Sequence, residues 1–297
     1  MLNVGIVGCG SWSKIIIKEI NNNKRFKLTS IVCRNKENEQ KKIKNFNSIK
    51  NMIDSNINDC IYVAALPYVN LEIVKLVKKL KIPLILEKPI SNSKNNIEKL
   101  KKITRENNLI IYPNLTNYYS NTFKHLKNYL DANYLEIRRV IIYEGNFGPF
   151  RENIHPIWDW GFHPISLLYL LFENKRFTNI SKKEIKSSNI RGNGIVTKFS
   201  FNINKKISVN IVTGNLFKNK LRKIKIILNN KDYIESDMLQ HKVKINSNVK
   251  YKGSETPITN LLNKFQSSIF LKHNEESKKL INISSKTINF LEKFYKC

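Results

Sequence analysis

GIVGCGSWS, residues 5–13, is the stretch of sequence that decides the fold. It continues a short apolar segment typical of a buried strand and opens SKIIIKEINN, which favours a helix. Gly8, Gly10 and Ser13 form GxGxxS, one residue short of a GxGxxG/A pattern. In that pattern the first glycine allows a tight turn, the second lets the backbone approach a pyrophosphate, and the third position needs a small residue. The stretch predicts a dinucleotide-binding turn, and an ordinary glycine turn is the alternative.

The first third of the chain alternates between strand and helix patterns. The expected strands are LNVGIVG, FKLTSIVC, DCIYVAAL, IPLILEK and LIIYP, and NLEIVKLVKKLK and NNIEKLKKITREN have helical spacing. Continuous apolar strands that alternate with helices indicate a parallel sheet covered on both faces. We therefore predict a Rossmann domain over residues 1–117.

The rhythm changes after residue 117. Strand patterns at IVTKFSFNI, KISVNIVTGN and KIKIILNN follow one another without helices between them, and the end of the chain is helical. Strands in succession favour an antiparallel sheet. Residues 118–297 are predicted to form an α+β domain with a mostly antiparallel open sheet, for substrate binding and oligomerisation.

Composition narrows the possible classes of protein. The 297 residues are 41% hydrophobic and carry a net charge of +29. The lysines are spread along the whole chain, which favours a compositional bias over a nucleic-acid surface. Salt-sensitive retention on DNA would support the nucleic-acid alternative. No metal-ligand spacing occurs, the four cysteines suggest no disulfide framework, and neither a signal peptide nor a membrane span is expected. We predict a cytoplasmic protein without membrane or specific nucleic-acid partners.

The end of the second expected strand bears on the cofactor. Cys33 and Arg34 stand where an Asp or Glu commonly holds the ribose 2′-hydroxyl of NAD. A guanidinium there suits the 2′-phosphate of NADP, although a solvated arginine is the alternative in so basic a chain. The residues favour NADP slightly over NAD.

LILEKPISN, residues 84–92, ends a predicted strand with Glu87, Lys88 and Pro89. The carboxyl ends of parallel strands are where ligands bind in such sheets. With the glycine turn, this motif resembles the Gfo/Idh/MocA family of glucose-fructose oxidoreductases and inositol dehydrogenases. The resemblance implies that Lys88 reaches the nicotinamide and the substrate, and it suggests a cis bond before Pro89.

WDWGFHP, residues 158–164, is similar to a D-x-G-x-H motif common in the same family. Pro164 is tolerated only in a first helical turn, so a helix is expected to begin near Trp160 with Asp159 as its N-cap. Taken singly, Asp159 would be a plain cap and His163 a core histidine. The resemblance makes His163 the general acid/base and Asp159 the residue that orients it.

The resemblance extends to TPITNLLNKF near the C-terminus, and two departures stand out: Ser13 replaces the third glycine, and ALPYVN replaces a threonine-proline segment.

The predicted catalytic residues are Lys88, Asp159 and His163. The predicted cofactor contacts are Gly8, Gly10, Ser11, Trp12, Ser13, Cys33, Arg34, Leu66, Pro67, Asn70, Glu87 and Lys88. The predicted substrate contacts are Lys88, Tyr118, Arg151 and His163, and no metal is expected.

These features predict an NAD(P)-dependent oxidoreductase that transfers a hydride between nicotinamide and a sugar, nucleotide-sugar or cyclitol hydroxyl or ketone. A role in surface glycan synthesis is a further expectation. The resemblance implies a homodimer or homotetramer. The alternative is a non-catalytic dinucleotide-binding regulator or scaffold of the same fold, which would have no need of Lys88, Asp159 and His163.

Overall fold

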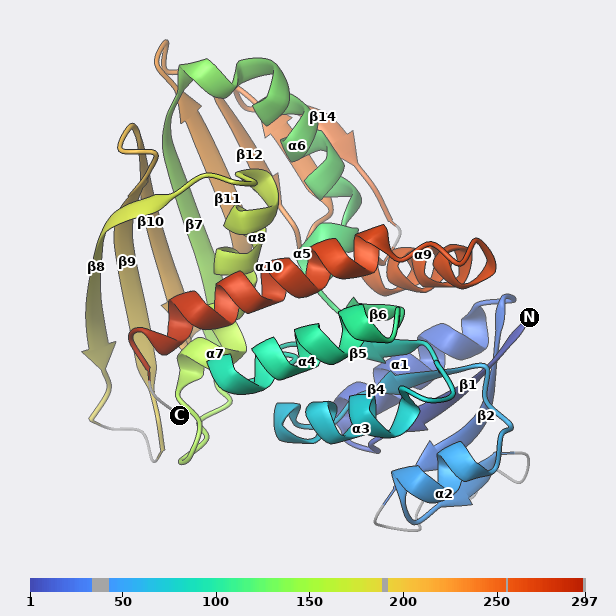
Figure 1. Ribbon diagram of the computed structural model, residues 1–297. Coiled ribbons are helices and arrows are strands. Elements are labelled where there is room, and N and C mark those ends of the chain that lie inside the picture. Colours follow the sequence, from blue (N-terminus) through green and yellow to red (C-terminus); the bar gives the residue numbers. More distant parts are fainter. Residues whose placement is uncertain (34–42, 189–191, 255, 296–297) are drawn as a thin grey trace. The chain divides into compact units, whose positions relative to one another are not determined.

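The computed structural model describes residues 1–33, 43–188, 192–254 and 256–295 (Figure 1). The described residues form two compact units. Unit 1 comprises Met1–Leu115 and Ile258–Glu292, and unit 2 comprises Thr116–Pro257 and Lys293–Tyr295.

This division differs from the predicted one at the C-terminus, which the sequence analysis places wholly in the second domain. Helix α10 (Glu275–Glu292) packs instead against α4 (Lys94–Glu106) and β6 (Ile111–Pro113) of unit 1. Ser277 of α10 both accepts from the backbone N–H of Ile111, at 2.9 Å, and donates to its carbonyl, at 2.8 Å. The helix thereby satisfies backbone groups at the edge of the sheet that would otherwise be unpaired.

Unit 1 contains a six-stranded parallel sheet of order β3-β2-β1-β4-β5-β6. Its strands are β1 (Leu2–Val7), β2 (Phe26–Val32), β3 (Lys44–Phe46), β4 (Cys60–Val63), β5 (Leu84–Leu86) and β6. Its helices are α1 (Ser11–Asn22), α2 (Ile49–Asp54), η1 (Pro67–Val69), α3 (Asn70–Val77), α4, α9 (Pro257–Phe270) and α10. Strands β4, β5 and β6 are buried at every residue, as expected for a sheet covered on both faces.

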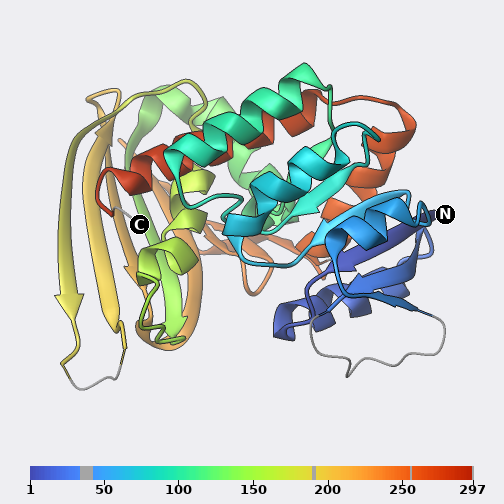
Figure 2. The same ribbon diagram turned by 60° about the horizontal axis from the view of Figure 1, so that its bottom comes forward.

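The order of the strands fixes where a ligand can bind. The chain moves outward from β1 to β3, returns to β4 and then moves the other way to β6, so β1 and β4 flank a topological switch point. Right-handed crossovers place α1 on one face and α2, α3 and α4 on the other. Helices α3 and α4 lie side by side over the sheet in both views (Figures 1 and 2). The Rossmann prediction is confirmed.

Unit 2 is built on an eight-stranded sheet of order β14-β13-β12-β11-β7-β10-β9-β8. Its strands are β7 (Ile137–Phe147), β8 (Phe177–Lys186), β9 (Ile195–Ile203), β10 (Ile207–Gly214), β11 (Leu216–Leu228), β12 (Tyr233–Asp237), β13 (Lys242–Ile245) and β14 (Asn248–Lys252). Only the β7–β10 pair is parallel among the described pairs, so the predicted mostly antiparallel sheet is confirmed.

One face of this sheet carries the helices of unit 2. They are α5 (Thr116–Tyr119), α6 (Asn121–Asn133), η2 (Tyr134–Glu136), α7 (Pro156–Trp160) and α8 (Phe162–Leu171), and α6 and α8 lie over the strands in Figure 1. Alternate residues of β9, such as Phe199 and Phe201, are buried, whereas Lys198 and Ser200, the residues that precede each of them, are exposed. This alternation is expected of a sheet covered on one face.

Within the parts of the chain that the structure describes, a helix with both the length and the apolar character of a membrane span is not found.

Candidate functional site

The glycine turn lies at the switch point of the Rossmann sheet. The N–H of Gly8 bonds to the carbonyl of Val32 at 3.0 Å, which continues the β1–β2 ladder into the turn. Gly8 has φ +110°, and a Cβ there would lie 2.5 Å from the carbonyl oxygen of Ala64, at the end of β4. Only glycine fits this conformation and this close approach.

The space around Gly10 is open, unlike that around Gly8. A Cβ on it would meet nothing within 4 Å, and its φ of −72° suits any residue. Gly10 is also the N-cap of α1, and no described side chain caps that helix. The first amides of α1 therefore border open space, and a helix N-terminus favours phosphate oxygens. An anionic group can approach the backbone here.

Ser13 meets the packing requirement of the third glycine position. It is fully buried, and its hydroxyl has no hydrogen-bond partner among the described residues. Its Oγ would lie 3.4 Å from a Cβ at Gly8, so helix and turn are closely packed there. Serine is small enough for this contact. The departure from GxGxxG leaves the geometry of the turn intact.

A hydrogen-bonded network joins the carboxyl ends of four strands in unit 1. The carboxylate Oε1 of Glu87, just after β5, accepts from Trp12 Nε1 at 2.6 Å, Tyr62 Oη at 2.5 Å and Asn114 Nδ2 at 2.8 Å. Asn114 Nδ2 also donates to Tyr62 Oη at 3.1 Å. Trp12 follows β1, Tyr62 lies on β4 and Asn114 follows β6. Glu87 thus holds the segment before Lys88 against the glycine turn.

Sequence reasoning missed Tyr62 and Asn114. Each is polar and stands within or directly after an apolar strand, at the edge where ligands bind in such sheets. That position is the signal that could have found them.

Lys88 is half-buried and follows Glu87 at this edge, and the peptide bond between Lys88 and Pro89 is cis. The turn after it is supported by Asn70, which donates from Nδ2 to the carbonyl of Ile90 at 3.0 Å. Asn70 is fully buried. The prediction makes Asn70 a cofactor contact, and in the structure its amide supports the turn beside Lys88.

The other predicted cofactor contacts lie along the same edge. Leu66 and Pro67 begin the η1 turn after β4, and Leu66 is exposed. Ser11 and Trp12 open α1, with Trp12 39% exposed. Arg34, on which the expected NADP preference depends, lies outside the described residues.

The cysteines differ from the sequence expectation. Cys9, between the two glycines, forms a disulfide with Cys33 at the end of β2, and their Cα atoms are 5.6 Å apart. The expectation of free cysteines is wrong for this pair, because the parallel β1–β2 register brings residues 24 positions apart side by side. Cys60 is a free, buried thiol whose pKa is raised by burial and by the nearby charge of Asp59.

In unit 2, Arg151 and Asp159 form an ion pair. Arg151 Nη1 lies 3.1 and 3.0 Å from the two carboxylate oxygens of Asp159. The loop that carries Arg151 is held by Asn193, whose Nδ2 donates to the carbonyls of Arg151 and Glu152 at 3.0 and 2.8 Å. The structure therefore brings together one predicted substrate contact and one predicted catalytic residue.

The helix boundary here differs from the predicted one. Pro156 is the first residue of α7, so Asp159 lies inside that short helix and is not its N-cap. His155 is the N-cap: its Nδ1 accepts from the N–H of Ile157 at 3.2 Å. A proline fits the first helical position, where its missing N–H has no partner to lose, so Pro156 marks the start better than Asp159 does.

His163 lies on α8, which begins at Phe162 after Gly161, and it is 6% exposed. Pro164 falls in the first turn of α8, as expected. Tyr118 is half-buried on α5, and its ring packs against Tyr119 and Phe123, with centroids 5.1 and 5.3 Å away. Asp159 and His163 share unit 2, whereas Lys88 belongs to unit 1.

A half-buried polar cluster supports the start of α7. His155 Nε2 lies 3.2 Å from Glu184 Oε1, and Glu184 also accepts from the hydroxyl of Tyr295. Burial lowers the pKa of His155, against the opposing effect of the Glu184 charge. Because Nδ1 serves as the cap acceptor, the neutral imidazole suits this arrangement.

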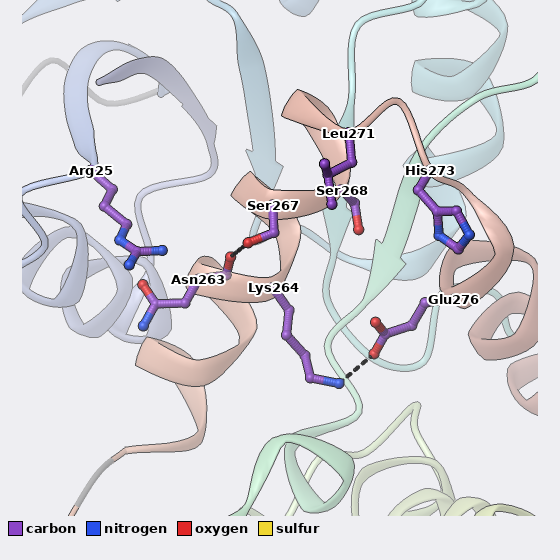
Figure 3. A pocket seen from close by; sticks show the side chains of 8 residues that line it. All are labelled: Arg25, Asn263, Lys264, Ser267, Ser268, Leu271, His273 and Glu276. Atoms are coloured by element: carbon purple, nitrogen blue, oxygen red, sulfur yellow. Dashed lines mark hydrogen bonds and ion pairs between the residues drawn. The ribbon is translucent and has the colours of Figure 1, made fainter.

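Unit 1 also has a hollow, whose lining side chains are shown in Figure 3. Its volume is about 330 Å³, and an ion pair between Lys264 and Glu276, at 2.8 Å, lies along it. It is lined by Arg25, Asn263, Lys264, Ser267, Ser268, Leu271, His273 and Glu276. Arg25 directly precedes β2, so this hollow is at the amino edge of the sheet. It contains none of the predicted site residues.

The fold and the carboxyl edge of unit 1 define a dinucleotide-binding α/β protein. A strand order of 3-2-1-4-5-6, a glycine turn at the switch point and an uncapped helix N-terminus together fit a pyrophosphate. The space beside Gly10 is what such a group requires.

Comparison with known proteins gives the family. Residues 2–115 match the Gfo/Idh/MocA model, described as an oxidoreductase family with an NAD-binding Rossmann fold. This match over the cofactor domain confirms the predicted resemblance to that family and the prediction of an NAD(P)-dependent oxidoreductase. No curated protein matches the chain.

Solved structures match along nearly the whole chain. A putative oxidoreductase from Magnetospirillum magnetotacticum is 16% identical, with 98% of each chain covered and a TM-score of 0.85. A myo-inositol 2-dehydrogenase from Lactobacillus plantarum is 13% identical, with 98% of this chain and 95% of that one covered and a TM-score of 0.79. A UDP-N-acetylglucosamine 3-dehydrogenase from Acidithiobacillus ferrooxidans is 12% identical, with 99% and 98% covered and a TM-score of 0.79. At these identities the likeness is one of fold.

Proposed function

We propose that the protein oxidises a hydroxyl, or reduces the matching ketone, of a sugar, nucleotide sugar or cyclitol, with NAD(P) as its cofactor. The observation that carries the proposal is the network around Glu87. It fixes the glycine turn, through Trp12, to the segment that contains Lys88. A bound cofactor and a cationic side chain, which can stabilise charge on the substrate oxygen, would therefore lie at the same edge of the sheet.

The cofactor, when bound, supplies hydride chemistry at its nicotinamide ring. The amides at the start of α1 would hold its pyrophosphate, and the open side of Gly10 would admit it. Glu87 would act as a positioning residue, because its Oε1 already accepts three hydrogen bonds from the protein.

The reaction must also move one proton on the substrate oxygen. Lys88 would donate a hydrogen bond to that oxygen and stabilise negative charge on it. His163 would be the general acid/base, because an imidazole ordinarily titrates near neutral pH. The ion pair with Arg151 gives Asp159 a defined position on α7. Assigning Lys88 and His163 to one reaction rests on the family resemblance.

The substrate class is inferred from related folds and from charge. Two structural neighbours carry names of dehydrogenases that act on inositol and on a nucleotide sugar. The net charge of +29 favours an anionic substrate, which suits a nucleotide sugar. A role in surface glycan synthesis, a cytoplasmic location, a homodimer or homotetramer, and Tyr118 as a substrate contact belong to the same proposal.

The preference for NADP rests on the residue type at position 34 alone. A charge-assisted hydrogen bond contributes about 1.5–3 kcal/mol, so NADPH should bind at least about tenfold more tightly than NADH. Arg34→Asp should reverse that order, because a carboxylate repels the 2′-phosphate and accepts from a ribose hydroxyl. Equal affinities in the wild type would remove the basis for the preference.

The test is a comparison of Lys88→Ala with the wild type. Oxidation of a panel of polyols, sugar acids and nucleotide sugars is followed by the absorbance of the reduced nicotinamide. Once a substrate is found, Lys88→Ala should lower kcat by about 100-fold or more, by analogy with the loss of an oxyanion donor, while NAD(P)H still binds.

Lys94→Ala is the matched control, since Lys94 lies at the start of α4 and outside the network. Turnover in Lys88→Ala equal to that of the control would refute the role of Lys88. Dinucleotide binding without turnover of any substrate would favour a regulator or scaffold of the same fold.

A further inference from the structure

The disulfide between Cys9 and Cys33 lies within the candidate cofactor site. Cys9 stands between Gly8, which forms the tight turn, and Gly10, which borders the open space. Cys33 follows β2, at the position where a Rossmann domain commonly holds the ribose of its dinucleotide. The bond therefore joins the two loops that a dinucleotide contacts through its pyrophosphate and its adenosine ribose.

This bond adds little to the cohesion of the sheet. Strands β1 and β2 already pair from Leu2↔Phe26 to Val7↔Val32, and the Gly8 N–H extends the pairing to Val32. The loops at residues 9 and 33 are thus held next to each other without a covalent link. The disulfide therefore mainly affects the residues that border the cofactor site. This favours a modification of that site over a bond that stabilises the fold.

Both cysteines of the pair are also open to exchange. Cys9 and Cys33 are half-buried, whereas Cys60 is completely buried and the pKa of its thiol is raised. Thiol–disulfide exchange requires an accessible sulfur and a thiolate. Of the three cysteines that the structure describes, only the two at the cofactor site are partly exposed, as exchange requires.

We propose that Cys9 and Cys33 form a reversible redox modification site, and that their oxidation to the disulfide weakens dinucleotide binding. This inference rests on the proposed function. The cystine fixes the spacing of Cys9 and Cys33, whose Cα atoms lie 5.6 Å apart, at the positions proposed to contact the pyrophosphate and the ribose. Reduction removes this covalent constraint on the spacing of Cys9 and Cys33.

The oxidant is a low-molecular-weight disulfide, RSSR. One cysteine thiolate attacks a sulfur of RSSR, the S–S bond breaks, and one RSH leaves after protonation. The second cysteine thiolate attacks the resulting mixed disulfide at the protein sulfur, which forms the Cys9–Cys33 bond and releases a second RSH. Two thiols are oxidised by two electrons, and RSSR is reduced to two thiols.

The experiment titrates the full chain with NADH, followed by nicotinamide fluorescence, after incubation with oxidised glutathione or with dithiothreitol. Alkylation followed by mass spectrometry reports the state of each cysteine, with Cys60 as the protected internal reference. The oxidised protein should bind NADH at least about tenfold more weakly, the factor that corresponds to about 1.4 kcal/mol. Dithiothreitol should restore the affinity.

Two kinds of variant separate the outcomes. The double variant Cys9→Ser/Cys33→Ser has no thiol left at the site, so it should bind NADH equally with and without oxidised glutathione, and Cys60→Ala should respond as the wild type does. Equal affinities of the oxidised and reduced wild type would overturn the redox site and leave the proposed function in place, as would a response that persists in the double serine variant. A reduced wild type that does not bind NADH or NADPH would overturn both.

Discussion

Glu87→Gln tests the network that links the glycine turn to Lys88. The substitution keeps the size of the side chain and replaces a charged acceptor with a neutral one. Oε1 of Glu87 accepts three hydrogen bonds, from Trp12, Tyr62 and Asn114. Bonds to a charged group contribute about 1.5–3 kcal/mol each and neutral ones about 0.5–1.5 kcal/mol. Since Glu87 is half-buried, the expected loss of unfolding free energy is roughly 1–3 kcal/mol.

Equilibrium unfolding in urea measures this loss, and Glu72→Gln is the control. Glu72 forms an exposed ion pair with Lys75 at 2.7 Å, three residues along α3, with its side chain 67% exposed. Removing such a pair changes stability by at most about 1 kcal/mol. Tyr62→Phe deletes a single donor to Glu87 and should fall between the two, at about 1 kcal/mol.

The same variants report on the cofactor site. Because Trp12 opens α1 beside the glycine turn, loosening its bond to Glu87 should also weaken NADH binding, whereas Glu72→Gln should not. If Glu87→Gln matches Glu72→Gln in both unfolding free energy and NADH affinity, the network does not position the turn. The link between the turn and Lys88 would then have to be abandoned.

The remaining predictions concern single positions. Gly8→Ala should destabilise the protein by about 1–3 kcal/mol in urea unfolding, because φ is +110° and a Cβ would meet the Ala64 carbonyl at 2.5 Å; unchanged stability would show that the turn relaxes easily. Burial lowers the folded-state pKa of His155, so the unfolded chain binds that proton first, and stability should fall as the pH drops below about 6.5. His155→Asn keeps an N-cap acceptor that does not titrate. Between about pH 7.5 and about pH 5, its unfolding free energy should therefore fall less than that of the wild type. Parallel curves for the two proteins would exclude His155 as the source of the pH dependence. His163→Ala should remove the acidic limb of the pH–rate profile. An unaltered profile would mean that another group is the general acid/base.

Much of unit 1 could be predicted because its signals are local. Strands β1, β4 and β5 are continuous apolar runs, and the glycine turn follows β1 directly. The network around Glu87 could not be predicted in the same way. Tyr62 and Asn114 lie 25 and 27 residues from Glu87, and only the strand order brings them to one oxygen.

Unit 2 shows where local patterns fail. The edge strand β8 (Phe177–Lys186) contains no buried residue, so no hydrophobic alternation marks it in the sequence. His155 is not a residue type that commonly caps a helix, and its role depends on Glu184, 29 residues away along the chain and set beside it by the sheet. The Cys9–Cys33 bond likewise depends on the parallel register of β1 and β2.

Gly10→Ala tests the central claim, that a dinucleotide binds at this turn, because it separates binding from folding. The open space beside Gly10 and its φ of −72° leave room for a Cβ, so urea unfolding should change by less than about 1 kcal/mol. The same methyl group would occupy the space that a pyrophosphate needs to approach the backbone. In a fluorescence titration of the reduced protein, wild type should bind NADH or NADPH, and Gly10→Ala should bind at least about tenfold more weakly. A stable Gly10→Ala variant with wild-type affinity would contradict the claim.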